Sequence, residues 1–307
     1  MSQLIDMPGT SPTGHDAMAQ IASGDGIDVR SFSVHQGMSQ LFSIELSVMS
    51  ENIDIDLDEV IGQDASFRRS NMSWSGVCSE MEQHRVDEAG LASYRLTIVP
   101  RFWLLTQRKN YRVFQFKSEL EIVLQILGEW GVEHEARVQA GAHKKRKFRV
   151  QYDESDFNFV SRLMEDAGIS YYFEPSEGGT KLVLDDEPQS RDVSQSDIPY
   201  LDSPNTTVER FVTRVAVRSK LRPGTMTIGD LDYRLPSTYQ PRASFTAGLA
   251  QEAPLEQFDY EPGAFLYNSG GDDSSPAADD RGASRTDDAA GAQKTQNRLF
   301  ERRNGAK

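Results

Sequence analysis

The chain has 307 residues, 37% of them hydrophobic and 26% charged, which is enough to bury the cores of two or three folded domains. Its net charge of −14 disfavours nucleic acid as a partner, because a phosphate-binding surface needs clustered positive charge. The sequence shows neither a signal-peptide pattern nor an apolar run of the ~20 residues that a membrane span needs, so we expect folding in the cytoplasm and no stable membrane insertion.

The amino-terminal third is predicted to be β-rich. Residues 1–26 are small and polar, with two prolines and four glycines, and are expected to form a flexible arm. Residues 27–106 predict a small antiparallel barrel or sandwich, because strands with turn patterns between them follow in close succession. Cys78, the only cysteine, is expected to be a buried apolar thiol. The elements are predicted as a strand from Ile27, strands at residues 41–48, 65–69, 72–83 and 91–99, and a short helix at 56–62.

Residues 107–188 combine helical and strand patterns, which predicts an α/β insertion between β-rich parts. Ser118 and Glu121 fit a capping box, in which the side chain of each residue accepts a hydrogen bond from the backbone N–H of the other. Apolar residues then recur at helical spacing as far as Gly128, so a helix is expected to begin after Ser118. Strands are expected at residues 111–114, 149–152, 169–174 and 181–185.

A second helix is predicted to follow the strand at residues 149–152. Asp153 or Ser155 is expected to cap its start, and Gly168 can adopt the left-handed conformation that ends a helix. The inward-facing stripe of this helix is expected to consist of Phe157, Val160, Leu163, Met164 and Ala167.

Residues 189–307 return to β patterning. Strands are predicted at residues 208–217, 224–230 and 255–260. Pro262 and Gly263 favour a turn after the last of these strands. Residues 268–293 are rich in Asp, Ser, Gly and Ala and offer too little apolar surface to offset the entropy of ordering them, so a mobile loop is expected. A short amphipathic helix is predicted at residues 294–303.

Residue types that could carry out chemistry are scattered in this sequence. No metal-ligand spacing, nucleophile elbow or phosphate-binding glycine loop occurs, so no catalytic, cofactor-binding or metal site is predicted. His134 lies between two glutamates and could recruit a metal ion, but an exposed polar strand is the favoured interpretation. The basic run His143–Lys147 is of the kind that can bind nucleic acid, yet a solvated loop is favoured. The five histidines are His15, His35, His84, His134 and His143.

Two groups of carboxylates could serve glycoside hydrolysis, which requires a pair of carboxyl groups about 5 Å or about 6.5–9.5 Å apart. The first group is favoured as the acidic first turn of a helix, where negative charge interacts well with the helix dipole. The second is favoured as the end of a strand at a turn. The groups are Asp153, Glu154 and Asp156, and Asp185, Asp186 and Glu187. Seven aromatic residues lie on apolar phases of their elements and are expected in cores, namely Trp74, Phe102, Trp103, Trp130, Tyr171, Tyr172 and Phe173.

Several stretches together resemble one known family. They are Tyr94–Pro100 with Leu104-Leu105, Glu121–Val123, Gln151–Phe173, Leu182–Asp186, and Phe258–Tyr260 with Pro262-Gly263. Their order and residue sequences are similar to those of the hub region of VgrG proteins, the spike of the type VI secretion system, and to those of related phage tail hubs. The resemblance covers roughly residues 27–305, and the middle stretch is its most specific part.

The resemblance implies a structural hub with no catalytic activity and no cofactor. It implies two tube-protein-like antiparallel β-barrels per subunit, at residues 27–106 and 189–307, which flank the α/β insertion at 107–188. Three subunits would then place six barrels in a pseudo-sixfold ring, so that a threefold spike can dock on a sixfold, Hcp-like tube ring. Baseplate proteins and a spike-tip or effector protein are the other implied partners, and the machine itself would export the chain.

One departure from the family limits what is carried over. Family members continue past the hub into an oligosaccharide-binding-like barrel and a triple-stranded β-helix needle, whereas this sequence stops at Lys307. Membrane puncture and any carboxy-terminal effector activity are therefore not assigned to these residues. Three alternatives stay open: a phage or phage-like tail baseplate hub, a cell-wall glycan hydrolase on a hub scaffold, and a standalone ligand-binding β-protein.

Overall fold

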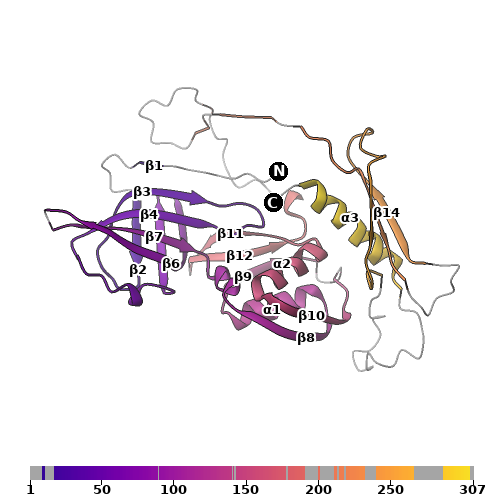
Figure 1. Cartoon of the computed structure of the whole chain (residues 1–307), viewed down its shortest axis with the longest axis horizontal. Coiled ribbons are helices and arrows are strands. Elements are labelled where there is room, and N and C mark those ends of the chain that lie inside the picture. The colour runs from indigo at the N-terminus through magenta and orange to yellow at the C-terminus, as the bar shows by residue number, and fades with distance from the viewer. Residues whose placement is uncertain are drawn as a thin grey trace.

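The structure is mainly β with an α/β insertion, as expected, and it contains three hydrophobic cores that follow one another along the chain (Figure 1). It is a computed structural model. The residues that it describes are 9–10, 17–88, 90–139, 141, 143–177, 179–190, 200, 211–212, 214–217, 219–231, 240–265 and 286–304.

The first core lies inside a curled, seven-stranded antiparallel sheet that forms a half-barrel (Figure 1). Its strand order is β1-β3-β4-β7-β6-β5-β2. The strands are β1 Gly9–Thr10, β2 Ala17–Ile21, β3 Asp28–His35, β4 Ser43–Ser50, β5 Asp64–Arg69, β6 Met72–Val86 and β7 Ala92–Val99, with a 3-10 helix at Leu57–Glu59.

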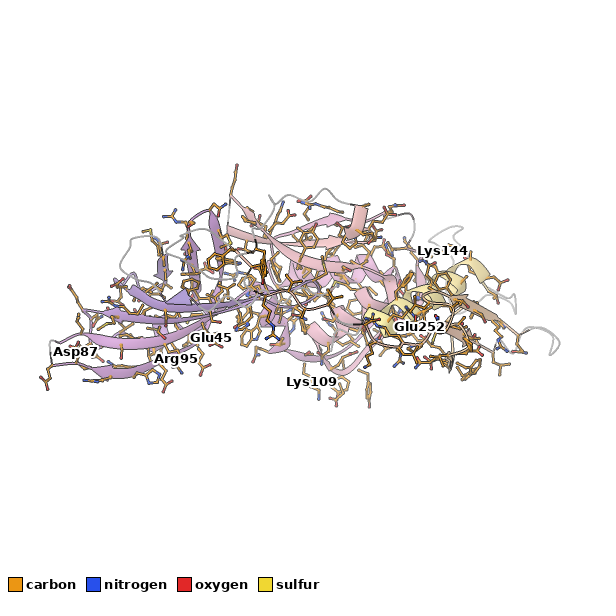
Figure 2. All side chains as sticks on the ribbon, turned by 90° about the horizontal axis from the view of Figure 1, so that it is seen from above. Glu45, Asp87, Arg95, Lys109, Lys144 and Glu252 are labelled. Atoms are coloured by element: carbon orange, nitrogen blue, oxygen red, sulfur yellow. The ribbon has the colours of Figure 1, made fainter. Side chains whose placement is uncertain are left out.

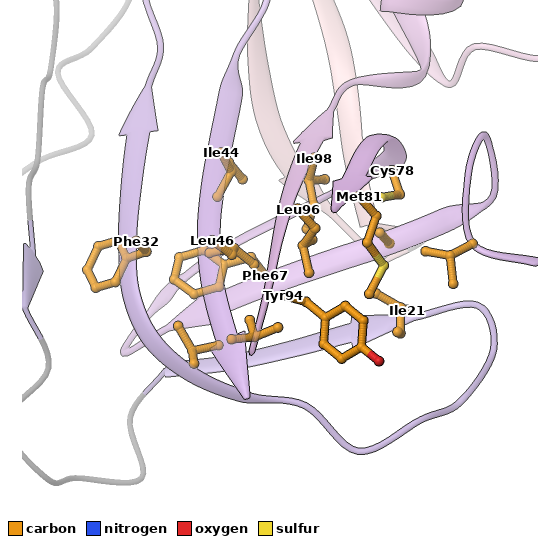
Figure 3. Close-up of a cluster of buried hydrophobic side chains, with 14 of the residues drawn as sticks. Ile21, Phe32, Ile44, Leu46, Phe67, Cys78, Met81, Tyr94, Leu96 and Ile98 are labelled. Carbon is orange, nitrogen blue, oxygen red and sulfur yellow. The ribbon is translucent and has the colours of Figure 1, made fainter. Parts of the chain in front are cut away.

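The alternation of apolar and polar residues in β4 determines which face of this sheet is buried, as the sequence predicts. Ile44 and Leu46 are fully buried, and Leu46 lies opposite Leu96 of β7, so both strands direct apolar side chains to one side (Figure 3). The exposed side chains of Glu45 and Arg95 lie on the other face (Figure 2). One face of the sheet is therefore core and the other is polar and open to solvent.

Cys78 is a buried thiol of β6, as expected (Figure 3). Its exposed fraction is 0%, and burial raises the pKa of the thiol to about 11. The thiolate is the reactive form of cysteine, so this thiol is unreactive at neutral pH.

The expectation of a flexible arm at residues 1–26 is wrong for its described part. Ala17–Ile21 forms β2, which pairs antiparallel with β5, and Ile21 is buried in the first core. Residues 9–10 form β1 and pair with β3. Ala17, Ala19 and Ile21 pack on the first core while Met18 and Gln20 between them are exposed, so this segment can cover the backbone edge that β5 would otherwise leave open.

The second core belongs to the α/β insertion. Helices α1 and α2 pack together and are flanked by a two-stranded sheet, β10-β8, and by a three-stranded sheet, β11-β12-β9 (Figure 1). A 3-10 helix, Arg101–Thr106, leads into the insertion. The elements are β8 Lys109–Lys117, α1 Glu119–Glu129, β9 His134–Arg137, β10 Arg146–Ser155, α2 Asp156–Ala167, β11 Ser170–Ser176 and β12 Gly179–Asp185, followed by a 3-10 helix at Pro188–Ser190.

Both helices of the insertion begin as the sequence predicts. The Glu121 backbone N–H donates to Ser118 Oγ at 3.2 Å, and the Ser118 backbone N–H donates to Glu121 Oε2 at 2.7 Å, which completes the capping box of α1. Ser155, rather than Asp153, caps α2, and Gly168 ends it at φ 73°. The predicted inward stripe of α2 leaves out one residue, Phe159, which is fully buried as well.

The third core lies between a three-stranded sheet and the last helix. The sheet has the order β14-β13-β15, and Met226 and Ile228 of β13 pack with Phe265 and with Leu299 of the helix. Closure of either β part into a barrel, and the domain boundaries after residues 26, 106 and 188, stay predictions. The elements are β13 Thr225–Gly229, β14 Arg242–Thr246, β15 Glu256–Tyr260 and α3 Asp288–Asn304.

Three predictions for this part need correction. Within residues 208–217, no strand forms at the described positions, where Val212 makes an isolated bridge with Tyr200 and Val217 is 96% exposed. Valine favours a strand only where a neighbouring strand pairs with it. The loop expected at 268–293 ends early, because α3 begins at Asp288; residues 266–285 lie outside the described part. The strand β14 was not predicted.

No helix among the residues that the structure describes combines the length and the apolar character that a membrane crossing requires.

Gly291 explains how α3 approaches the third core so closely. A Cβ atom at this position would lie 2.1 Å from the ring of Phe265, which is itself fully buried. We expect Gly291→Ala to lower the free energy of unfolding by about 1–3 kcal/mol through overpacking, despite the better helix propensity of alanine. Gly128→Ala in α1 is the matched control, because no atom lies within 4 Å of the added Cβ. It should raise stability slightly, and equal effects in urea unfolding would contradict the packing argument.

Candidate assembly surfaces

The two-stranded sheet of β8 and β10 has an unusual inner face. Arg112 and Gln151, which are partners in the register, point toward the helices and not toward solvent. Gln151 has an exposed fraction of 0%. Polar groups in such a position are stable only if each finds a partner, and both side chains here donate to the carboxylate of Asp156 at the first turn of α2.

Asp156, at the first position of α2, is the centre of one such cluster and is fully buried. Its Oδ2 atom accepts hydrogen bonds from Arg108 Nε at 2.7 Å and Trp130 Nε1 at 3.0 Å. Its Oδ1 atom accepts from Arg112 Nη2 at 2.9 Å and Gln151 Nε2 at 2.8 Å. Burial alone would raise the pKa of this carboxyl, but the hydrogen bonds and the two arginines outweigh it and hold the pKa below its usual value.

Glu119, at the first position of α1, forms the second cluster. Arg146 Nε and Arg149 Nη2 each lie 2.5 Å from Glu119 Oε1, and all three side chains are at most 19% exposed. Both clusters place negative charge at a helix amino terminus, where the dipole also favours it. These ion pairs bind the two-stranded sheet to the helices.

Burial would raise the pKa of the Glu119 carboxyl, but the attraction of Arg146 and Arg149 outweighs it and holds the pKa below its usual value of 4.5. A depressed pKa in the folded state stabilises the fold above the unfolded value and loses that contribution as pH falls through the folded value. We therefore expect stability in urea to decline once the pH drops below about 4.5. The Glu119→Gln variant should show a shallower decline, and an unchanged slope would contradict this assignment.

The outer face of the same sheet carries an exposed apolar stripe. It consists of Tyr111, Val113, Phe148, Val150 and Tyr152, whose exposed fractions are 62%, 62%, 59%, 37% and 74%. Val113 lies opposite Val150 and Tyr111 opposite Tyr152, and the two tyrosine rings meet edge to face at 5.2 Å. Contiguous exposed apolar surface of this kind marks interaction sites in soluble proteins.

The junction between α3 and the insertion is a network of charges. Lys294 is 4% exposed and forms an ion pair with Glu261 and another, at 3.8 Å, with Asp166 of α2. Arg298 lies 3.4 Å from both of these carboxylates. Ahead of the helix, Lys144 pairs with Asp287. The carboxy-terminal part is thus joined to the insertion mainly through ionic contacts.

The basic run His143–Lys147 is therefore not the solvated loop that the sequence favours. Lys144 and Arg146 have specific acidic partners, and Arg146 is 6% exposed. The His143 side chain is 8% exposed, and its Nε2 atom has no hydrogen-bond partner although Asp186 Oδ2 lies 3.8 Å away. These residues line a cavity of about 440 Å³ between the insertion and α3. Sequence spacing alone could not reveal their partners, which lie far along the chain.

The first sheet and the insertion are joined differently. The Ser39 backbone N–H donates to the Tyr171 carbonyl oxygen at 2.7 Å, and the Ser75 N–H donates to Thr180 Oγ1 at 2.8 Å. Phe173 of β11 packs against both the first and the second hydrophobic core and meets the ring of Phe42 at 5.0 Å. Apolar packing and hydrogen bonds therefore fix these two parts to one another.

The first candidate carboxylates are occupied by structural contacts. Asp153 pairs with Lys109 at 2.8 Å and accepts a hydrogen bond from Tyr111. The hydrogen bond from Lys109 is the main cause that lowers the pKa of Asp153. Glu154 pairs with Arg162 at 2.7 Å. A general acid for glycoside hydrolysis needs a raised pKa, so the lowered values of Asp153 and Asp156 give the hydrolase alternative no support.

The second candidate group also makes contacts within the fold. Asp185 is fully buried at the end of β12 and accepts a hydrogen bond from the Glu187 backbone N–H at 2.9 Å. Asp186 accepts one from the Gln139 backbone N–H at 2.8 Å. The favoured interpretation of a strand end at a turn describes this group well.

The histidines and aromatic residues lie mostly as expected. His134 begins the exposed edge strand β9, which pairs parallel with β12. Over the described positions, which leave out His15, no group of three or more His, Cys, Asp and Glu side chains is placed to hold a metal ion. Of the seven aromatic residues, Trp74, Phe102 and Tyr171 are buried, and Trp103, Trp130, Tyr172 and Phe173 are partly buried.

The fold is similar to that of known tail proteins. In structure, the chain is similar to the tail protein from Neisseria meningitidis, with a TM-score of 0.58 at 10% identity over 95% of this chain and 78% of that one. It is also similar to the Escherichia coli c3393 protein, a component of the type VI secretion system, with a TM-score of 0.53 at 22% identity over 60% of this chain and 52% of that one.

Residues 35–307 match the family described as phage tail baseplate hub (GPD), and the chain belongs to that family. It is 32% identical over 249 residues to the type VI secretion system spike protein VgrG5 of Pseudomonas aeruginosa. The aligned region covers 79% of this chain and 31% of that protein. Identity to VgrG4b of the same organism is 33% over 253 residues, 78% of this chain and 30% of that protein. The chain spans about a third of the length of these curated relatives, and the resemblance inferred from the sequence is confirmed.

Proposed function

We propose that the chain is the structural hub at the base of a type VI secretion spike, a homotrimeric adaptor between a sixfold tube and a threefold spike. The observation that carries the proposal is the identity of about a third to two spike proteins over nearly four fifths of the chain. The order of the parts supports it, since two β parts flank a compact insertion. Two barrel-like parts in each of three subunits would supply the six positions that a hexameric, Hcp-like tube ring requires.

In this proposal the hub acts by shape and contact and not by catalysis. It passes the movement of the tube to the spike ahead of it, and its other partners are baseplate proteins and a spike-tip or effector protein. The chain assembles in the bacterial cytoplasm and is then exported by the machine. The ion-paired helix starts at Glu119 and Asp156 serve this role by keeping the insertion rigid.

Light scattering of the purified chain, alone and with tube rings, tests the proposal. We expect a mass three times the 34.4 kDa of one chain, at the latest when tube rings are present. A mass of one chain under both conditions would contradict a trimeric hub. Cryo-electron microscopy of the complex with the tube protein would then show the ring directly.

A phage-like tail hub is the second candidate, and the family description and the similarity to the Neisseria meningitidis tail protein favour it. The two candidates differ in the tube protein that they bind. Mixing the chain with type VI tube rings and, separately, with phage tail tube protein should give a stable complex with only one of them.

A further inference from the structure

We propose that the apolar stripe on β8 and β10 packs against a second copy of this chain, as part of the contact that closes the homotrimer. The inference rests on the proposed function, because it names the surface that the trimer would use. The stripe lies on the sheet face that points away from α1 and α2, and no described part of the same chain covers it.

The size of the stripe suits the core of an interface between subunits. Its three aromatic residues, Tyr111, Phe148 and Tyr152, are 59–74% exposed, so they alone present on the order of 400 Å² if a whole aromatic side chain offers about 150–250 Å². A stable interface buries about 800 Å² on each partner. Tyrosine is also among the residues that most often dominate binding. The stripe therefore supplies roughly half of one subunit's share.

The charges at the border of the stripe favour a copy of this chain as the occupant. Each chain carries a net charge of −14, so three copies repel one another unless they meet at neutral surfaces. Two pairs of opposite charge that border the stripe cancel, Lys109 with Asp153 at 2.8 Å and Arg162 with Glu154 at 2.7 Å. An apolar centre with a satisfied polar rim is the usual anatomy of an interface between proteins.

The contact uses the face of the sheet and not the edge of β10. Arg162 Nη2 donates to the carbonyl oxygen of Val150 at 2.8 Å, which occupies an acceptor that an added strand would need. Side chains of the stripe are therefore the groups to change in a test.

The test compares Val113→Lys with Val86→Lys in the full chain. Both valines are exposed on antiparallel strands, at 62% and 46%, but Val86 lies at the far end of β6, outside the stripe. We expect Val113→Lys to weaken trimer formation by roughly thirtyfold or more, the loss typical of a hot-spot residue, and Val86→Lys to leave it unchanged. Circular dichroism and thermal unfolding confirm that each variant is folded.

Cross-linking is a second test, and its result does not depend on destabilising the assembly. Cys78 is fully buried, so a thiol introduced by V113C can be labelled selectively with a photo-cross-linker. We expect cross-links between copies, identified by mass spectrometry. If the wild-type chain is trimeric but Val113→Lys stays trimeric and no such cross-link forms, the inference is overturned and the proposed function stands. A wild-type chain that stays monomeric with tube rings overturns both.

Discussion

Replacing Asp156 with Asn should lower the free energy of unfolding by about 3 kcal/mol, because it removes the buried carboxylate that balances the charges of Arg108 and Arg112. Arg108 and Arg112 both bind this carboxylate, which has no exposed surface. The expected loss lies at the lower end of the range for breaking a buried ion pair, because Glu129 still lies within 2.9 Å of both arginines. Urea unfolding followed by circular dichroism measures the effect.

Asp153→Asn is the matched control for this experiment. Asp153 lies three residues earlier, is 49% exposed and holds a left-handed backbone at φ 53°, which asparagine tolerates. We expect only a small change in the urea midpoint, since exposed ion pairs contribute little. If the two variants shift the midpoint equally, burial of the Asp156 cluster is not what stabilises the insertion.

The second large effect is expected from Lys294→Met at the junction of α3 with the insertion. This change removes the buried cation that faces Asp166 and Glu261 and leaves these carboxylates with the more exposed Arg298, at 3.4 Å from each, so α3 should loosen from the insertion. We expect a loss of about 3–5 kcal/mol and much faster amide hydrogen exchange in α3 than in α1.

Lys144→Met separates this effect from a general weakening of the junction. Lys144 reaches Asp287, immediately before α3, but its side chain is 46% exposed. An exposed pair contributes about 1 kcal/mol or less, so exchange in α3 should change little. Equal exchange rates in the two variants would show that burial of Lys294 does not matter to the docking of α3.

The elements that were predicted correctly are those fixed by neighbouring residues. Ser118 and Glu121 form the capping box because they are three positions apart, and Gly168 ends α2 because the left-handed conformation costs little for glycine. The β4 alternation determined the buried face of the first sheet in the same local way.

The parts that were missed depend on partners distant in the sequence. In β10 the polar residues Arg149 and Gln151 face inward, while Phe148, Val150 and Tyr152 face solvent. Local periodicity shows that two faces differ but does not say which of them is buried. The sequence offered one indication of the buried face: the number of acidic residues in the first turns of α1 and α2 matches the number of arginines in β8 and β10.

Val217 illustrates the opposite error, in which a strand is predicted where the described residues form none. A β-branched segment predicted a strand at 208–217, yet the described residues 214–217 have no neighbouring strand to pair with. The helix α3 began earlier than predicted because alanine-rich sequence at its start favours a helix once Gly291 can pack on Phe265. In each case the presence or absence of a contact from elsewhere in the chain decided the local structure.

The two kinds of joint along the chain have a mechanical consequence. Phe173 and the hydrogen bonds of Ser39 and Ser75 join the half-barrel to the insertion through apolar packing and direct contacts. Lys294 and Arg298 instead attach α3 through ion pairs that are largely buried, so dissolved ions screen them only weakly. If the proposed hub is loaded along its axis, we expect deformation to concentrate beside α3. Added salt should change the compliance of that joint only through its more exposed pair, Lys144 with Asp287.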